Sequence, residues 1–182
     1  MRFNDDAYLQ EFKQSGKFPK IHDDIYFTIV KNIKDKDITV LDLGSCTGLL
    51  TVRLSKYFNE VIGVEASKVD MNKSIIKQNT TYLNTDINDI SIQMIIDVYK
   101  PKLIVCRRVL PEISNNNEQE FCKFVDTITE NKIEYLAIEG RQLSKNSVHF
   151  LSSIDKEISF FYKYRVIDKF KNVAILKYNE IL

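Results

Sequence analysis

The stretch VLDLGSCTG at residues 40–48 decides how this chain is expected to fold. The residues from Ile38 to Leu43 are mostly apolar on both faces, which is typical of a buried strand in a parallel sheet. Gly44 and Gly48 then allow a tight turn in which the backbone can approach a ligand closely. Leucines at helical spacing follow, and the amino end of a helix suits a carboxylate or phosphate. The stretch therefore predicts a ligand site at the carboxyl edge of a sheet.

A second signal follows one strand later. The residues EVIGV at 60–64 predict the next strand, and Glu65 ends it about 20 residues after Gly44. An acidic residue at this distance is placed to accept hydrogen bonds from ribose hydroxyls. In one β-α-β unit, the two signals predict binding of a nucleoside-containing cofactor. The plainer alternative is a glycine turn followed by a solvated glutamate at a strand end.

The rest of the chain alternates short apolar runs with longer amphipathic ones, which predicts an α/β fold with a mostly parallel sheet. We expect an N-terminal arm over 1–20, with an apolar face of Tyr8, Leu9 and Phe12, and one domain over 21–182. The expected helices cover 23–34, 48–58, 67–77, 91–99, 117–129 and 145–154. The expected strands cover 38–43, 60–64, 81–84, 103–106 and 133–138, with a closing antiparallel pair at 157–168 and 172–178. Seven strands with helices on both faces make a doubly wound domain.

The composition excludes several classes of function. Lys and Arg number 26 against 25 Asp and Glu, so the net charge of +1 supplies no general attraction to nucleic acid or to anionic membrane. Three widely spaced cysteines form no Cys-x-x-Cys and no Cys/His cluster, which predicts neither disulfides nor a metal site. We see no signal peptide and no apolar run of about 20 residues, and therefore expect a cytoplasmic protein.

From about residue 20 to 178, the sequence resembles the class I S-adenosylmethionine-dependent methyltransferases. The pattern Asp42-x-Gly44-x-x-x-Gly48 looks like their first motif, and Glu65 looks like their acidic ribose-binding residue. The resemblance implies a Rossmann-like methyltransferase fold, S-adenosyl-L-methionine as cofactor, and transferase activity. The Gly-x-Gly-x-x-Gly pattern of NAD-binding proteins is absent, so a dehydrogenase is the poorer fit.

The resemblance also assigns roles to residues further along the chain. Asp86 matches the acidic residue that contacts the adenine amino group, and Ile87 would pack on the adenine face. Cys46 stands where the family usually has glycine, so its side chain narrows the approach to the methionine part of the cofactor, and a positive φ there would strain it. The implied cofactor-binding residues are Asp42, Gly44, Ser45, Cys46, Gly48, Glu65, Ala66, Asp86, Ile87 and Arg107.

The residues expected to contact the methyl acceptor give a less distinctive sequence pattern than the cofactor-binding residues do. Arg107 and Arg108 fall where family members line the methyl-transfer site, and two arginines at a strand end suit bidentate binding of a carboxylate or phosphate. Glu112 is a candidate base for a substrate proton. The plainer alternative is an Arg–Glu ion pair that orders the loop. We expect Glu139 to pair with one of the arginines, and His22 to be a surface residue.

These residues predict a methyltransferase whose acceptor is a small molecule or is delivered by a partner. No inserted recognition domain is visible, and the Asn-Pro-Pro-Tyr and Pro-Cys motifs of enzymes that methylate bases are absent. Nucleic-acid and membrane partners are therefore disfavoured, whereas a homo-oligomer or a protein partner stays open. The alternative is a non-catalytic S-adenosylmethionine-binding sensor or interaction protein on the same fold.

Overall fold

The computed structural model describes residues 20–72, 74–87, 92–141 and 149–180. Their seven strands form one sheet in the order β3-β2-β1-β4-β5-β7-β6. The first five are parallel, β7 runs antiparallel to β5, and β6 runs antiparallel to β7. This confirms the predicted mostly parallel sheet with its closing antiparallel pair. The strands are β1 (Thr39–Leu43), β2 (Glu60–Glu65), β3 (Thr80–Asn84), β4 (Leu103–Arg107), β5 (Tyr135–Glu139), β6 (Tyr164–Phe170) and β7 (Val173–Tyr178).

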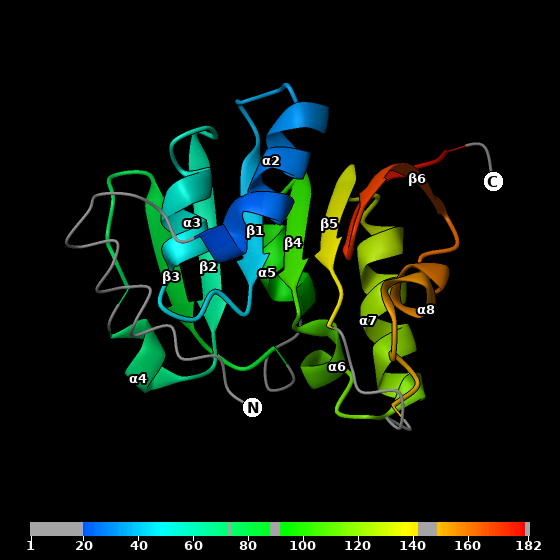
Figure 1. The fold of residues 1–182 in the computed structure, drawn as a ribbon. Helices are drawn as coiled ribbons and strands as arrows, with labels where there is room; N and C mark the ends of the chain where they lie inside the picture. The colour runs from blue at the N-terminus through cyan, green and yellow to red at the C-terminus, as the bar shows by residue number, and fades with distance from the viewer. Residues whose placement is uncertain (1–19, 73, 88–91, 142–148, 181–182) are drawn as a thin grey trace.

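Helices cover both faces of the sheet (Figure 1). Val40 packs in the core of one face with α2 and α3, whereas Leu41 and Leu43 pack on the opposite face with α5, α7 and α8. Because strand side chains alternate between faces, a strand buried on both sides is mostly apolar. The helices are α2 (Asp23–Asn32), α3 (Leu49–Leu54), α5 (Ile92–Tyr99), α7 (Glu118–Glu130) and α8 (Ile154–Ser159).

Three short helical turns complete the described elements: η1 (Lys20–His22), α4 (Lys68–Met71) and α6 (Leu110–Ile113). In Figure 1, α4 and α6 lie at the carboxyl ends of the parallel strands. The sequence predicted a loop where α6 forms. Pro111 stands in its first turn, where the missing amide proton costs no hydrogen bond. This edge of the sheet is where an open parallel sheet binds ligands.

Several expected elements differ from the structure, and the helix expected over 48–58, which ends at Leu54, is one of them. The helix expected over 67–77 ends at Met71, and Ser67 caps it by accepting a hydrogen bond from the amide of Asp70. The strand expected from residue 157 begins only at Tyr164, because α8 occupies residues 154–159. Ser153 caps α8, and the acidic Asp155 and Glu157 in its first turn favour a helix. The helix expected over 145–154 is wrong where the structure describes it, because residues 149–153 are not helical and α8 begins only at Ile154. Residues 145–148 of that helix, and residues 1–19 of the expected N-terminal arm, lie outside the described residues.

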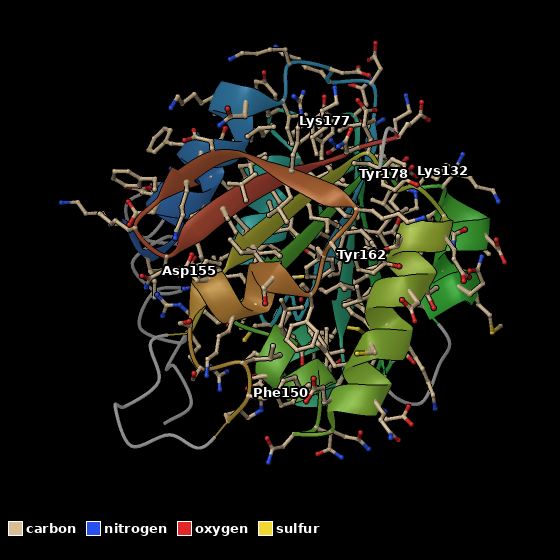
Figure 2. The ribbon with its side chains drawn as sticks, turned by 90° about the vertical axis from the view of Figure 1, so that its right-hand side faces the viewer. Lys132, Phe150, Asp155, Tyr162, Lys177 and Tyr178 are labelled. Atoms are coloured by element: carbon tan, nitrogen blue, oxygen red, sulfur yellow. The ribbon has the colours of Figure 1, made fainter. Side chains whose placement is uncertain are left out.

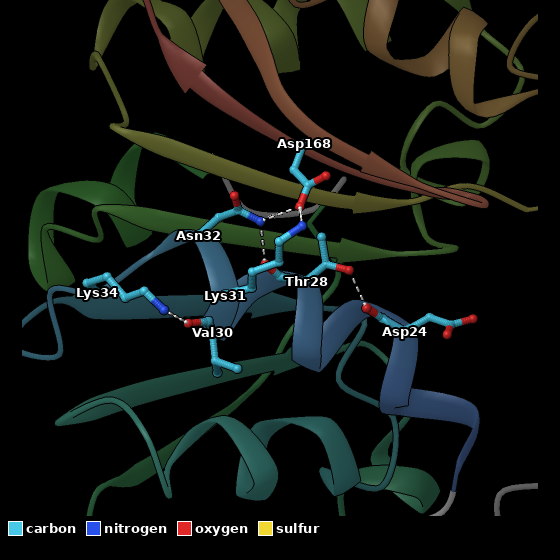
Figure 3. A network of polar contacts seen from close by, with 7 residues as sticks. All are labelled: Asp24, Thr28, Val30, Lys31, Asn32, Lys34 and Asp168. Atoms are coloured by element: carbon cyan, nitrogen blue, oxygen red, sulfur yellow. Dashed lines mark hydrogen bonds and ion pairs between the residues drawn. The ribbon is translucent and has the colours of Figure 1, made fainter.

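The polar network of Figure 3 fastens α2 to the edge strand β6. The amide of Asn32 donates to a carboxylate oxygen of Asp168 at 2.7 Å, and the ammonium of Lys31 donates to the same oxygen at 2.9 Å. Hydrogen bonds from Asn32 and Lys31 lower the pKa of Asp168. The network therefore joins residues more than 130 positions apart in the chain.

Aromatic side chains pack together between α7 and the residues on either side of α8. Figure 2 shows β6 with α8 and α7 beside it, and labels Phe150 next to them. The ring of Phe121 on α7 meets those of Phe150 and Phe160 edge-on, with centroids 5.9 and 5.2 Å apart. Such pairs contribute about 0.5–1.5 kcal/mol beyond their buried area. These rings therefore pack the residues on either side of α8 against α7.

Candidate functional site

The loop between β1 and α3 depends on its glycines. Gly44 and Gly48 have φ of +70° and +76°, a region that side chains disfavour. A Cβ on Gly48 would collide with the hydroxyl of Tyr82, and one on Gly44 would lie 2.7 Å from Cγ2 of Val109. Cys46 also has a positive φ, +50°, without being glycine. The strain anticipated for Cys46 is therefore present.

Glu65 holds this loop in place from the end of β2. One carboxylate oxygen accepts a hydrogen bond from the amide of Cys46 at 2.8 Å, and the other accepts one from the amide of Ser67 at 2.7 Å. An ionised carboxylate has about four lone-pair positions, so two bonds leave acceptor capacity for a ligand. Glu65 thus organises two loops and also lines the pocket described below.

Asp42 is buried beneath the loop. The hydroxyl of Thr51 donates to its Oδ2 at 2.7 Å, which ties α3 to β1. Burial raises the pKa of Asp42 to about 7, although the bond from Thr51 and the charge of Arg107 act in the opposite direction. Asp42 is not among the pocket-lining residues, so in this structure it supports the loop from behind.

A pocket of about 230 Å³ opens at the carboxyl ends of β1 and β2. It brings together predicted cofactor residues from three loops: Gly44, Glu65, Ala66, Asp86 and Ile87. Of the predicted acceptor-side residues, Glu112 lines it, but Arg107 and Arg108 do not. Ser45, Cys46 and Gly48 lie outside the lining as well. The complete lining is Leu43, Gly44, Val64, Glu65, Ala66, Thr85, Asp86, Ile87, Val109, Glu112 and Ile113.

Arg107 and Arg108 converge on Glu139, which is only 4% exposed at the end of β5. Nε of Arg108 donates to Glu139 Oε1 at 2.6 Å, and Nε of Arg107 lies 3.2 Å from Oε2 in an ion pair. The expectation that Glu139 pairs with an arginine is confirmed, and it pairs with both. One carboxylate thereby fixes two guanidinium groups at the end of β4.

Glu112 joins this cluster through a third arginine. Its carboxylate forms an ion pair with Arg141, and Nη2 of Arg141 also donates to the backbone oxygen of Arg108 at 3.0 Å. Glu112 itself is exposed on α6 and forms part of the pocket wall. Arg141 therefore links Glu112 in the pocket wall to the backbone of Arg108.

His22 is not the surface residue expected from the sequence, because only 3% of it is exposed. Burial, together with the charges of Arg107, Arg53 and Arg108, lowers its pKa to about 3. The imidazole is therefore neutral at physiological pH. The sequence did carry a signal: residues 22, 25, 29 and 33 follow helical spacing, and all four are buried. No comparable signal pointed to Tyr82, since its contacts with the glycine loop arise only in the tertiary structure.

The described part of the chain contains no group of three or more His, Cys, Asp or Glu residues that could hold a metal ion. Within those same ranges, no helix is long and apolar enough to cross a membrane.

Solved methyltransferase structures match this fold at low sequence identity. The N-methyltransferase NodS from Bradyrhizobium japonicum has a TM-score of 0.67 and 12% identity, over 97% of this chain and 99% of that one. An S-adenosylmethionine-dependent methyltransferase from Clostridium acetobutylicum has a TM-score of 0.66 and 14% identity, over 96% and 97%. Magnesium protoporphyrin IX methyltransferase from Synechocystis, solved with bound S-adenosylmethionine, has a TM-score of 0.59 and 12% identity, over 97% and 84%.

A shorter part of the chain is also similar in sequence to a curated protein. A candidate methyltransferase of Dictyostelium discoideum is 34% identical over 79 residues, which is 43% of this chain and 30% of that protein. The matched segment thus covers less than a third of the relative's length. No protein-family model matches the sequence. Topology and structural similarity together show that the chain has the fold of the class I S-adenosylmethionine-dependent methyltransferases.

Proposed function

We propose that the chain binds S-adenosylmethionine in the pocket at the ends of β1 and β2 and transfers its methyl group to an acceptor. The observation that carries the proposal is that Glu65, Asp86 and Ile87, from two different strand ends, line one pocket. Their chemistry fits a nucleoside. Carboxylates accept hydrogen bonds from ribose hydroxyls and an amino group, and Ile87 offers an apolar surface to the purine face.

The glycine loop fits the remainder of the cofactor. Gly44 lines the pocket and has no side chain, so the backbone can approach a ligand there. Glu65 fixes the amide of Cys46, which keeps the loop in one conformation before a ligand arrives. Under this proposal Ser45, Cys46 and Gly48 hold the methionine part, and Asp42 supports them from below.

Bound S-adenosylmethionine would supply an electrophilic methyl group, which leaves the protein mainly the task of orienting the acceptor. We assign this task to Arg107, Arg108 and Glu112. Glu112 lies in the pocket wall and is placed to accept a hydrogen bond from the acceptor. The two arginines, fixed by Glu139, supply positive charge at the end of the neighbouring strand. The acceptor would be a small molecule or a partner-delivered group.

The alternative function is binding of S-adenosylmethionine without transfer, as in a sensor. Glu112, whose carboxylate can accept a hydrogen bond or a proton from an acceptor, lines the same pocket as the proposed nucleoside residues. Its position supports a transferase over a sensor. Loss of label from methyl-labelled S-adenosylmethionine in the presence of a metabolite extract distinguishes the two.

Calorimetric titration of the full chain with S-adenosylmethionine and S-adenosylhomocysteine, with NAD as control, tests the proposal. Glu65→Ala should weaken binding at least about tenfold, because hydrogen bonds to a charged group contribute roughly 1.5–3 kcal/mol. Glu60→Ala is the matched control, since Glu60 is an exposed residue at the opposite end of the same strand. Equal affinity in the Glu65 variant, or preference for NAD, would refute the proposed site.

A further inference from the structure

Arg108, the residue directly after β4, has a backbone conformation that its side chain disfavours. Its φ is +57°, in the left-handed region where a Cβ crowds the following carbonyl oxygen. Arg108 is half-buried, whereas five other described residues with such a φ are exposed. They are Lys100, Asn115, Asn116, Lys132 and Lys171. Strain of this kind persists only where the surrounding structure fixes it, and it clusters at functional sites.

Two residues at the end of β5 fix the backbone of Arg108. The backbone oxygen of Glu139 accepts a hydrogen bond from the amide of Arg108 at 2.7 Å, and its carboxylate accepts one from Nε at 2.6 Å. Nη2 of Arg141 donates to the backbone oxygen of Arg108 at 3.0 Å. The amide, the carbonyl and the side chain of Arg108 are thus all bound. These contacts offset the cost of its left-handed conformation.

The turn at Arg108 determines where α6 begins. Val109 is the N-cap of α6, and its carbonyl oxygen accepts hydrogen bonds from the amides of Glu112 and Ile113 at 2.9 and 3.0 Å. The side chain of Val109 lies so close to the glycine loop that a Cβ on Gly44 would stand 2.7 Å from its Cγ2. Val109, Glu112 and Ile113 all line the pocket. A change of φ at Arg108 would therefore move one wall of the pocket relative to Gly44.

Arg141 also contacts this wall directly. Its guanidinium forms an ion pair with Glu112 on α6, in addition to its bond to Arg108. It therefore ties the helix to the turn from which the helix starts. Among the described residues, the pocket lining includes Glu112 but neither Arg141 nor Glu139. Any effect of these two residues on a ligand in the pocket is exerted through α6.

Resting on the proposed function, we propose that Glu139 and Arg141 are positioning residues, which hold Arg108 in its left-handed conformation and thereby keep α6 against Gly44 as a wall of the cofactor pocket. A residue with a side chain disfavours this conformation by roughly fivefold to thirtyfold, and a glycine adopts it readily. The proposal therefore predicts that a glycine in place of Arg108 makes the contacts of Glu139 and Arg141 less important for binding.

The first test compares Arg108→Ala with Arg108→Gly by calorimetric titration of the full chain with S-adenosylhomocysteine. Both substitutions remove the guanidinium, but only glycine relieves the strain. We expect Arg108→Ala to bind at least about fivefold more weakly than Arg108→Gly. The same two substitutions at Lys132, an exposed residue with φ of +50° at the opposite edge of the sheet, are the matched control. There glycine should raise the melting temperature relative to alanine without changing the affinity.

The second test removes the positioning residues themselves. Arg141→Gln should weaken binding of S-adenosylhomocysteine about threefold or more in the wild-type chain, but less than about twofold in the Arg108→Gly background. Glu139→Gln should show the same dependence on the background. Glu139 is buried and also pairs with Arg107, so melting curves must show that this variant is folded. If it is not folded, Arg141→Gln decides the test. A merely structural role would lower the melting temperature in both backgrounds and leave the affinity unchanged.

Two results would overturn the inference: equal affinity in Arg108→Ala and Arg108→Gly, or an equal loss from Arg141→Gln in both backgrounds. Titration of the wild-type chain separates this inference from the proposed function. If the wild-type chain binds S-adenosylhomocysteine, either result refutes only the positioning role. If the wild-type chain does not bind it, the proposed function is refuted and this inference with it.

Discussion

The buried carboxyl group of Asp42 should make the stability of this protein depend on pH, and Asp42→Asn should remove that dependence. The side chain is 1% exposed, and its described hydrogen-bond donor is the hydroxyl of Thr51. Asparagine has nearly the same shape and its amide oxygen can accept the same bond. The substitution therefore removes the charge while keeping the packing.

The size of the effect follows from the pKa. Burial raises the pKa of Asp42 from 3.8 to about 7. Below pH 3.8 the group is protonated in both folded and unfolded chains. Between about pH 4 and 7 the unfolded chain loses the proton that the folded chain keeps, so stability falls as pH rises. At roughly 1.4 kcal/mol for each pH unit, the wild-type chain loses about 4 kcal/mol through this group, and the loss is complete above pH 7.

Urea unfolding at pH 4.5 and pH 8 measures this change directly. We expect the two chains to have similar stability at the lower pH, and the Asn variant to be more stable by a few kcal/mol at the higher pH. Comparing the variant with wild type cancels the pH dependence of other groups, such as His22 and Glu157. Asp126→Asn, which removes an exposed carboxylate on α7, is the control. A stability difference between wild type and Asp42→Asn that is the same at both pH values would refute the reasoning.

Two further predictions concern backbone strain and the α2–β6 contact. Cys46→Gly should raise the free energy of unfolding by about 1 kcal/mol, because φ of +50° is strained for a side chain and unstrained for glycine. Cys46→Ala should bring no gain, and an equal gain in both variants would attribute the effect to the thiol. Asp168→Asn should lower stability by about 1 kcal/mol at pH 7, through loss of charge-assisted bonds from Asn32 and Lys31. Because the pKa of Asp168 is lowered in the folded chain, this loss should shrink as the pH falls through that pKa, and a loss that persists in acid would contradict the assignment.

The fold was predictable because its signals are local. An apolar strand, a glycine turn and a helix follow one another over residues 38–58, and the same alternation continues to β5. The prediction of secondary structure was weakest where a helix-capping residue stands close to an apolar stretch that looks like a strand. Residues 157–163 look like the start of a strand, but Ser153 and the acids after it start a helix just before them. The short helix α6 was missed because four residues are too few to show a period.

The residue composition of the pocket was predictable in part, for a reason of geometry. Parallel strands end at one edge of the sheet, so Gly44, Glu65 and Asp86, each following a strand, were expected to lie near one another. Which of them line the same cavity depends on how the loops fold back. Arg107 and Arg108 follow β4 in the same way, yet they turn toward Glu139 and lie outside the pocket lining.

The sequence by itself determined the strand–turn–helix unit, the need for glycine at positions 44 and 48, and the acidic residue at the end of β2. These features depend on side-chain periodicity and on backbone conformations that neighbouring residues set. Only the tertiary structure decided that Glu139 is shared by two arginines, that the ring of Tyr82 lies against Gly48, and that His22 is buried. Those contacts join segments far apart in the chain, and the order and register of the strands, which no local pattern encodes, bring them together.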